Sequence, residues 1–252
     1  MSKTSPDVVE HREWLCSLVD VTAVGSLLDV GCGSGEDVMA IAKRVPIQDA
    51  RLIGLDGSAE AVERARRSAA DDSRLVFQVH RIGSALPFDN GSFDVVYSNN
   101  LLECIGDKAE FLRDVARVLR PGGQVVFAHW DWDSQTLDAG DKDLVRRIVH
   151  TFADWQQGWM EHSDGWMGRR LWSAFQATSQ FEGGIRARVL TNTTYSEPWY
   201  GHARIADCGS MAKRGLISSD DYERLIEQVE ELAAADRYFY SVTCYAYVGR
   251  KL

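Results

Sequence analysis

The stretch LLDVGCGSGED, near the start of the chain, contains three glycines and the carboxylate Asp29, and a further carboxylate, Asp56, stands 19 residues after it. Gly31, Gly33 and Gly35 follow an apolar run that carries Asp29, and Asp56 ends the next apolar run. Glycines let a ligand reach backbone N–H groups, and a carboxylate placed like Asp56 can accept hydrogen bonds from both hydroxyls of a ribose. The pattern favours a nucleotide-like ligand. A plain glycine turn, with Asp56 capping the following helix, is the alternative.

The spacing of the glycines and the sign of the nearby charge narrow the kind of nucleotide. A dinucleotide fingerprint has two residues between its second and third glycines, whereas a single residue separates Gly33 from Gly35 here. Asp29 would repel a pyrophosphate but would attract a ligand that carries an ammonium and a sulfonium. The sequence therefore favours a cationic nucleoside, and an oxidoreductase that uses a nicotinamide cofactor is a disfavoured alternative.

Alternating strands and helices would place these residues. The apolar runs SLLDV, RLIGL, LVFQV, FDVVY and QVVFA are typical of buried strands, and apolar residues at helical spacing follow the first run between Val38 and Val45. Ser58 can cap a second helix, and Asp107 and Glu110 have capping-box spacing at the start of a third. Short buried strands joined by helices predict an α/β fold with a doubly wound parallel sheet, in which ligands bind at the C-terminal strand ends.

Two of these stretches resemble the motifs of a known family. LLDVGCGSGED resembles the first motif of the class I S-adenosylmethionine-dependent methyltransferases, and LIGLDGS resembles their second. The likeness continues from Arg81 to Ala128 and is similar to the small-molecule branch that includes the ubiquinone and menaquinone methyltransferases. The resemblance covers residues 24–128 strongly and the rest more loosely. It implies a Rossmann-like, mostly parallel sheet of seven strands whose last strand runs antiparallel, and S-adenosylmethionine as the cofactor.

The resemblance also implies which residues bind the cofactor. The glycines of the first motif would face the methionine portion, and Asp56 would face the ribose. The backbone at the start of RIGSALPF would hold the adenine, and the residues after FDVVY would form the rim near the methyl group. The expected cofactor-binding residues are Asp29, Gly31, Gly33, Asp56, Gly57, Ile82, Gly83, Ser98 and Asn99.

One position departs from the family's pattern. The family usually has an acidic residue that holds the adenine amino group, but Ile82 stands there in this sequence. Apolar packing and backbone bonds would then hold the adenine. For Asp37, beside Glu36, one interpretation is a first-turn acid that the dipole of its helix favours and that has no further role.

Tryptophans point to the acceptor region. Seven of the eight tryptophans fall between Trp130 and Trp199, which suggests an aromatic-walled chamber for a flat aromatic acceptor or a cationic amine. We expect Trp130, Asp131 and Trp159 to bind the acceptor. The alternative is ordinary core packing, because five apolar residues share one predicted helical face: Leu144, Ile148, Phe152, Trp155 and Trp159.

His129 is the best-placed candidate for a catalytic base. It follows the predicted fifth strand in FAHWDWD, and a phenol or an ammonium acceptor must lose a proton. Methyl transfer from a sulfonium is an in-line displacement that alignment and desolvation can accelerate without a base. His129 as a structural histidine therefore remains an alternative, as does a cofactor-binding module without activity. Asp131 and Asp133 could instead hold a cationic acceptor.

Composition limits the possible partners. The chain has 252 residues, 45% of them apolar, and a net charge of −9, which argues against a protein that coats nucleic acid or an anionic membrane. Five cysteines without a C-x-x-C pair predict reduced thiols and no metal site. No signal-like or membrane-spanning apolar run occurs, so a cytoplasmic protein is expected.

The expected organisation is one methyltransferase domain over residues 1–252. Residues 1–23 would form an N-terminal helical segment and residues 24–134 the cofactor-binding core. Residues 135–215 would form a helical and aromatic cover over the acceptor site, and residues 216–252 the final helix and last strand.

Overall fold

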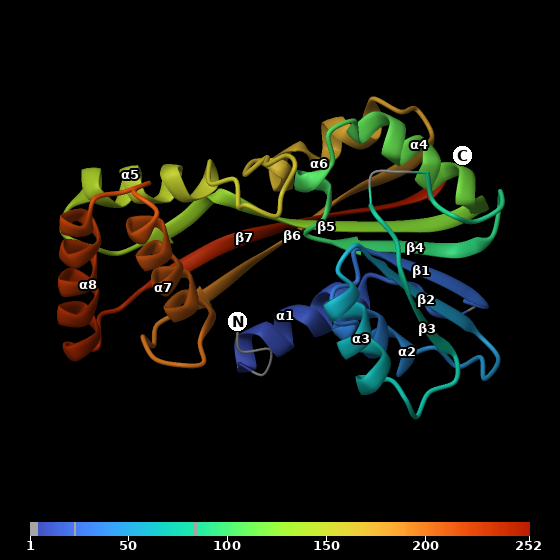
Figure 1. Ribbon diagram of the computed structural model, residues 1–252, viewed down its shortest axis with the longest axis horizontal. Helices are drawn as coiled ribbons and strands as arrows, with labels where there is room; N and C mark the ends of the chain where they lie inside the picture. The colour runs from blue at the N-terminus through green and yellow to red at the C-terminus, as the bar shows by residue number, and fades with distance from the viewer. Residues whose placement is uncertain (1–4, 23, 83–84) are drawn as a thin grey trace. The chain divides into compact units, whose positions relative to one another are not determined.

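The computed structural model describes residues 5–22, 24–82 and 85–252, and its strands form one seven-stranded sheet in the order β3-β2-β1-β4-β5-β7-β6 (Figure 1). The α/β fold and the number of strands are as predicted. The strands are β1 Ser26–Val30, β2 Arg51–Asp56, β3 Leu75–Val79, β4 Phe93–Asn99, β5 Leu119–Leu137, β6 Phe181–Asn192 and β7 Tyr240–Lys251.

The first five strands are parallel. Strand β1 pairs in parallel with β2 and with β4, β2 pairs with β3, and β4 pairs with β5. All five residues of β1 are buried, because a parallel sheet covered on both faces needs apolar side chains on both sides of its strands. All five strands predicted from the apolar runs are therefore confirmed.

The last strand of the chain runs antiparallel to β5. Near the start of β5, the Lys251 Nζ donates to the Leu119 carbonyl oxygen at 2.9 Å, and beyond its end the Asp138 N–H donates to the Phe239 carbonyl oxygen at 3.1 Å. The end of β7 thus lies beside the start of β5, and the start of β7 beside the end of β5. The sheet is mixed, as the family resemblance implied.

Two helices begin at the caps that the sequence predicts, whereas α2 ends at Ala42, before the predicted limit at Val45. Ser58 caps α3, since its Oγ accepts from the Ala61 N–H at 3.2 Å, and Asp107 caps α4 by accepting from the Glu110 N–H at 2.8 Å. Figure 1 shows α4 on the opposite face of the sheet from α2 and α3, as a doubly wound fold requires. The helices are α1 Pro6–Ser17, α2 Glu36–Ala42, α3 Ala59–Ser68, the 3₁₀ helix η1 Leu102–Cys104, α4 Lys108–Val118, α5 Lys142–Ala153, α6 Met167–Gln176, α7 Tyr200–Lys213 and α8 Ser219–Ala234.

The chain divides into two compact units. We call residues 12–129, 169–186 and 245–252 the glycine unit, and the described part of residues 1–11 with residues 130–168 and 187–244 the tryptophan unit. Strands β5, β6 and β7 contribute residues to both units. The core of the glycine unit surrounds β1 and includes Leu27, Ile41, Leu52, Val62, Phe77 and Val95.

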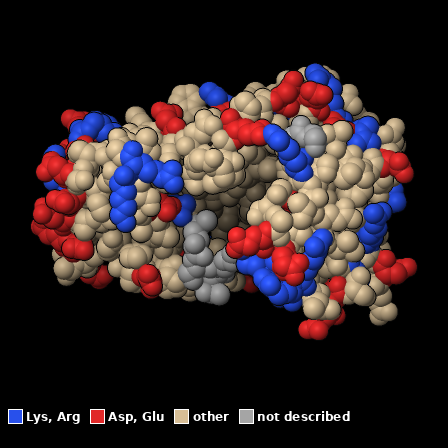
Figure 2. All heavy atoms as spheres, viewed as in Figure 1, with Lys and Arg blue, Asp and Glu red and all other residues tan. Residues whose placement is uncertain are grey.

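Carboxylates dominate the exposed side of α8 in the tryptophan unit. Glu223, Glu227, Glu230 and Glu231 are exposed there, and Figure 2 shows acidic side chains gathered over this helix at the left of the view. No helix in the described ranges is long and apolar enough to cross a membrane.

Candidate active site

The loop after β1 is held by the end of β2. The N–H groups of Gly31 and Cys32 both donate to the Leu55 carbonyl oxygen, at 2.8 and 2.9 Å. The Gly33 N–H donates to the Asp56 Oδ2 at 2.8 Å. The loop glycines have left-handed backbones, with φ of 78° at Gly31 and 54° at Gly33, a conformation that other residues adopt only at a cost.

The two outer glycines of the loop, Gly31 and Gly35, are closely packed, whereas the middle one, Gly33, is not. A Cβ on Gly35 would lie 2.6 Å from the Phe77 Cε1, and a Cβ on Gly31 would lie 3.0 Å from the Leu101 Cδ1, so both positions allow close packing. A Cβ on Gly33 would meet nothing within 4 Å. The described structure therefore leaves open space beside the Gly33 backbone, where a ligand can approach it.

Asp56 closes this loop and keeps further acceptor capacity. Its Oδ2 accepts from Gly33, and its Oδ1 accepts from the Ser58 N–H at 2.8 Å. Each carboxylate oxygen can accept a second hydrogen bond, so the side chain suits a pair of ribose hydroxyls. The cap of α3 is Ser58, so the helix itself does not require a carboxylate at position 56.

Asp29 is a buried carboxylate beneath the loop. Its side chain is only 2% exposed, and its Oδ2 has no hydrogen-bond partner among the residues that the structure describes. Burial raises the pKa of the Asp29 carboxyl well above its ordinary value of 3.8, and the charges of Asp37, Asp56 and Glu36 raise it further. A buried acceptor of this kind matches a ligand that brings an ammonium group, so the site fits the cationic cofactor that the resemblance implies.

The end of β4 lies next to the glycine loop. The Ser98 Oγ donates to the Val30 carbonyl oxygen at 2.7 Å and ties β4 to β1. The Asn99 Nδ2 donates to the Asp37 Oδ2 at 2.9 Å. Asp37 thus contacts a residue that was expected at the cofactor rim, a role not predicted from its place in the first turn of α2.

The residues expected near the adenine are described only in part. Ile82 is half-buried and takes part in an isolated bridge, whereas Gly83 lies outside the described residues. A Cβ on Gly57 would lie 3.8 Å from the His80 carbonyl oxygen, an ordinary contact. The His80 N–H donates to the Asp56 carbonyl oxygen at 2.9 Å, which continues the pairing of β2 and β3 beyond the strands.

His129 lies in β5 of the glycine unit and is fully buried. Its Nε2 lies 3.7 Å from the Glu103 Oε2 of η1, and Glu103 is only 7% exposed. This distance is too long for a hydrogen bond but suits an ion pair when the imidazole carries a proton. Glu103 was not predicted from the sequence, although a carboxylate inside the apolar run LLEC was a visible signal.

Aromatic side chains cluster within the tryptophan unit. Trp130 is 5% exposed and stacks on His11, with ring centroids 4.3 Å apart and planes 22° apart. The Trp130 ring also lies 5.2 Å from Tyr200 and 6.3 Å from Trp132. Asp131, next in the chain, is only 1% exposed. These contacts show aromatic packing around one of the expected acceptor residues.

Trp159 has a different environment. It is 69% exposed, and its Nε1 donates to the Gln157 Oε1 at 3.0 Å. The expectation that Trp155 and Trp159 continue the apolar face of α5 is wrong, because the helix ends at Ala153. Asp154 closes it by donating its N–H to the carbonyl oxygens of the last turn, and the chain leaves the helix before either tryptophan.

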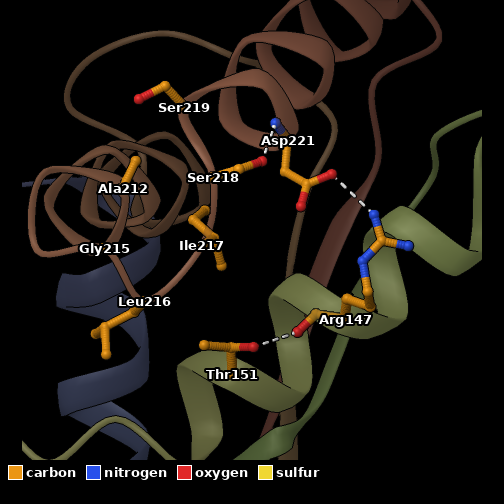
Figure 3. Close-up of a pocket in the computed structure, with 9 residues that line it drawn as sticks. All are labelled: Arg147, Thr151, Ala212, Gly215, Leu216, Ile217, Ser218, Ser219 and Asp221. Atoms are coloured by element: carbon orange, nitrogen blue, oxygen red, sulfur yellow. Dashed lines mark hydrogen bonds and ion pairs between the residues drawn. The ribbon is translucent and has the colours of Figure 1, made fainter.

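A pocket of about 550 Å³ lies in the tryptophan unit, lined by α5, by the end of α7, by the start of α8 and by the segment between α7 and α8. Figure 3 shows the side chains that line it. The Arg147 Nη2 pairs with the Asp221 Oδ1 at 2.8 Å, and the Thr151 Oγ1 donates to the Arg147 carbonyl oxygen at 2.7 Å. None of the residues predicted to bind cofactor or acceptor lines this pocket. Its charged groups are paired with each other.

A glycine loop and two carboxylates at the carboxyl ends of parallel strands define a nucleotide-binding protein of the Rossmann-like class. The family described as methyltransferase domain matches residues 23–189. Since this match covers more than half of the chain, the chain belongs to that methyltransferase family.

Curated relatives match somewhat less than half of the chain. A 27-O-demethylrifamycin SV methyltransferase from Amycolatopsis mediterranei is 38% identical over 114 residues, 44% of this chain and 40% of the relative. A demethylmenaquinone methyltransferase from Shouchella clausii is 34% identical over 121 residues, 46% of this chain and 51% of the relative. The chain thus spans only two fifths to one half of the length of these relatives.

The fold extends the likeness over the whole chain. The crystal structure of the YcgJ protein from Bacillus subtilis superimposes with a TM-score of 0.61 at 20% identity, covering 96% of this chain and 98% of that one. At this identity the likeness concerns the fold alone.

Proposed function

We propose that the protein transfers a methyl group from S-adenosylmethionine to a small-molecule acceptor. The observation that carries this proposal is the arrangement at the carboxyl ends of β1 and β2: the Asp56 carboxylate bonded to the Gly33 N–H, open space beside Gly33, and a buried Asp29 oxygen that lacks a donor in the described ranges. The ribose of the cofactor would donate to the Asp56 carboxylate, and its methionine portion would lie beside the Gly33 backbone. The ammonium of that portion would donate to the Asp29 oxygen.

Within this proposal each cofactor residue has a task. Asp56 holds the ribose, the loop backbone at Gly31 and Gly33 lies along the methionine portion, and Asp29 faces its ammonium. Ser98 and Asn99 form the rim near the methyl group. Gly57, Ile82 and Gly83 complete the nucleoside side, by backbone and apolar contact. When bound, the cofactor supplies a methyl group on a positively charged sulfur, which leaves as a neutral thioether.

We assign proton transfer to His129. The imidazole takes the proton that a hydroxyl or ammonium acceptor loses as its new bond to carbon forms. Glu103, 3.7 Å from the Nε2, then stabilises the imidazolium. Burial of both groups keeps water from the transferred proton.

For the acceptor we propose an aromatic or amine-bearing metabolite. In the tryptophan unit, Trp130, Asp131 and Trp159 would contact it, through ring stacking, cation–π attraction and charge. The support is the packed aromatic group around Trp130 and the buried carboxylate beside it. Two curated relatives are named a demethylmenaquinone methyltransferase and a 27-O-demethylrifamycin SV methyltransferase, and these names support a small-molecule acceptor.

We also propose a cytoplasmic location and no nucleic-acid partner. All five cysteines are free thiols, which suits a reducing compartment. The net charge of −9 and the acidic surface of α8 disfavour binding to phosphate backbones.

The test begins with binding of S-adenosylhomocysteine, measured by calorimetry. Absence of binding by the folded protein would refute the proposal. A mass-spectrometric screen of metabolites for the gain of one CH₂ group then identifies the acceptor. Binding without turnover on any metabolite would favour a second candidate function, a cofactor-binding module without activity. The observation that favours this candidate is the complete burial of His129, the proposed base.

A further inference from the structure

Asp37, at the start of α2, collects three hydrogen-bond donors within the glycine unit. Its Oδ1 accepts from the Arg12 Nε of α1 at 3.0 Å, and its Oδ2 accepts from the Tyr97 hydroxyl and from the Asn99 Nδ2, each at 2.9 Å. The side chains of Arg12 and Asp37 are only 21% and 17% exposed. A first-turn acid that served the helix dipole alone would need none of these partners.

The position of Asp37 fixes the orientation of the Asn99 amide. An ionised carboxylate only accepts hydrogen bonds, so the amide group that faces Asp37 at 2.9 Å must be the NH₂. The Asn99 Oδ1 is therefore turned away from Asp37. This oxygen is buried, and no donor reaches it from residues 5–22, 24–82 or 85–252.

Asn99 ends β4, next to the strand that carries the glycine loop. Ser98 bonds to the Val30 carbonyl oxygen directly before Gly31, so the carboxyl ends of β4 and β1 lie side by side. The ends of these neighbouring strands thus carry two buried oxygens that have no hydrogen-bond donor in the described ranges. They are the Asn99 Oδ1 and the Asp29 Oδ2. An ammonium has three donors and no acceptor, and it is the group that matches them.

We propose that Asp37 is a positioning residue, which holds the Asn99 amide with its oxygen toward the ammonium of the methionine portion of S-adenosylmethionine. Arg12 balances the charge of Asp37 and joins α1 to this network. The inference rests on the proposed function. It refines the role of Asn99, whose amide oxygen contacts the ammonium rather than the methyl group, and it adds a residue that acts through Asn99 without touching the cofactor.

A double-mutant cycle on the full chain tests this coupling. Asp37→Ala and Asn99→Ala should each weaken binding of S-adenosylhomocysteine roughly tenfold to hundredfold, the range for one hydrogen bond to a charged group. The double variant should bind no more than about threefold more weakly than the worse single variant, because both changes remove one interaction. Additive losses would show that Asp37 acts independently of Asn99 and would overturn the inference.

5′-Methylthioadenosine supplies the second readout, since it lacks the ammonium and carboxylate of the methionine portion. Its affinity should change by less than about threefold in Asp37→Ala. An equal loss for both ligands would indicate general damage to the nucleoside site and would also overturn the inference. If Asp37→Ala does not fold, Asp37→Asn replaces it. The amide has only one accepting oxygen for the three donors, so this variant should bind S-adenosylhomocysteine several-fold more weakly than wild type.

Asp94→Ala is the matched control. Asp94 lies toward the opposite end of β4 and accepts from the Gly25 N–H, the Ser26 N–H and the Ser26 Oγ at 2.8 to 3.0 Å. Its loss should lower stability and leave the affinity for S-adenosylhomocysteine within about twofold of wild type. A wild-type protein that binds neither ligand would overturn the proposed function together with this inference, whereas normal binding that survives Asp37→Ala would overturn the inference alone.

Discussion

Asp29→Asn should stabilise the cofactor-free protein and weaken its binding of S-adenosylhomocysteine. The Asp29 carboxyl is buried, and its Oδ2 lacks a donor in the described part of the chain. The negative charges of Asp37, Asp56 and Glu36 also disfavour its ionisation. Folding therefore opposes ionisation of Asp29. An amide of the same shape carries no charge and avoids this penalty.

The size of the effect follows from proton linkage. The pKa of Asp29 in the folded protein lies well above its ordinary value of 3.8, so below that value both folded and unfolded chains hold the proton and no penalty exists. As the pH rises, the unfolded chain loses its proton first, and the free energy of unfolding of wild type falls by at most about 1.4 kcal/mol per pH unit. The fall ends at the folded-state pKa. At about pH 7 the ceiling is about 4 kcal/mol.

Urea unfolding at several values between about pH 5 and about pH 8 measures this difference directly. The advantage of Asp29→Asn over wild type should grow with pH and should shrink toward zero as the pH approaches 3.8. Asp94→Asn, a carboxylate-to-amide change at a site with three donors, should instead lower the free energy of unfolding. An Asp29→Asn variant that is less stable than wild type by the same amount at every pH would refute the reasoning.

Three further outcomes follow from the site. Asp56→Ala removes the acceptor of the Gly33 N–H and should cost S-adenosylhomocysteine about 2–3 kcal/mol of binding free energy by calorimetry, so unchanged affinity would exclude the ribose role. Gly35→Ala forces a Cβ to within 2.6 Å of a Phe77 ring atom at a φ of 81°, and should lower the free energy of unfolding by about 2–4 kcal/mol in urea; wild-type stability would contradict the packing argument. His129→Ala should reduce turnover roughly 10²–10⁴-fold with cofactor affinity nearly intact, and Glu103→Gln should reproduce part of that loss; parallel loss of binding would make the histidine structural.

The sequence predicted the parts of the fold that local physics determines. Strand β1 was visible as a continuous apolar run because both of its faces are buried, and the caps at Ser58 and Asp107 were visible because side-chain oxygens satisfy the first N–H groups of a helix. The antiparallel last strand came from the family resemblance. No local pattern distinguishes it from a parallel strand, since its direction depends on pairing with β5, more than a hundred residues earlier in the chain.

The end of α5 shows why a helical period alone misleads. Phe152 is buried and on the expected face, but the helix stops at Ala153. Trp155 and Trp159 keep the spacing of that face without lying on a helix. The period predicts which residues share a face only as far as the helix extends, and Asp154, a residue that favours helix ends, was the available signal.

Some residues of the candidate site could be predicted from the sequence, and others could not. Gly33 and Asp56 could be paired from the sequence because parallel strands bring their carboxyl ends together, and their hydrogen bond of 2.8 Å follows from that topology. Glu103 left a signal as a carboxylate inside an apolar run, but the roles of Glu103 and Asp37 could not be predicted, because each depends on a partner from a distant segment. The partner of Glu103 is His129, and the partners of Asp37 include Arg12 and Asn99. The role of a carboxylate can be predicted from the sequence when its position at the end of a strand or helix determines that role. The role of a carboxylate that holds another side chain, as Asp37 holds the Asn99 amide, becomes clear only when the structure shows the donors around it together.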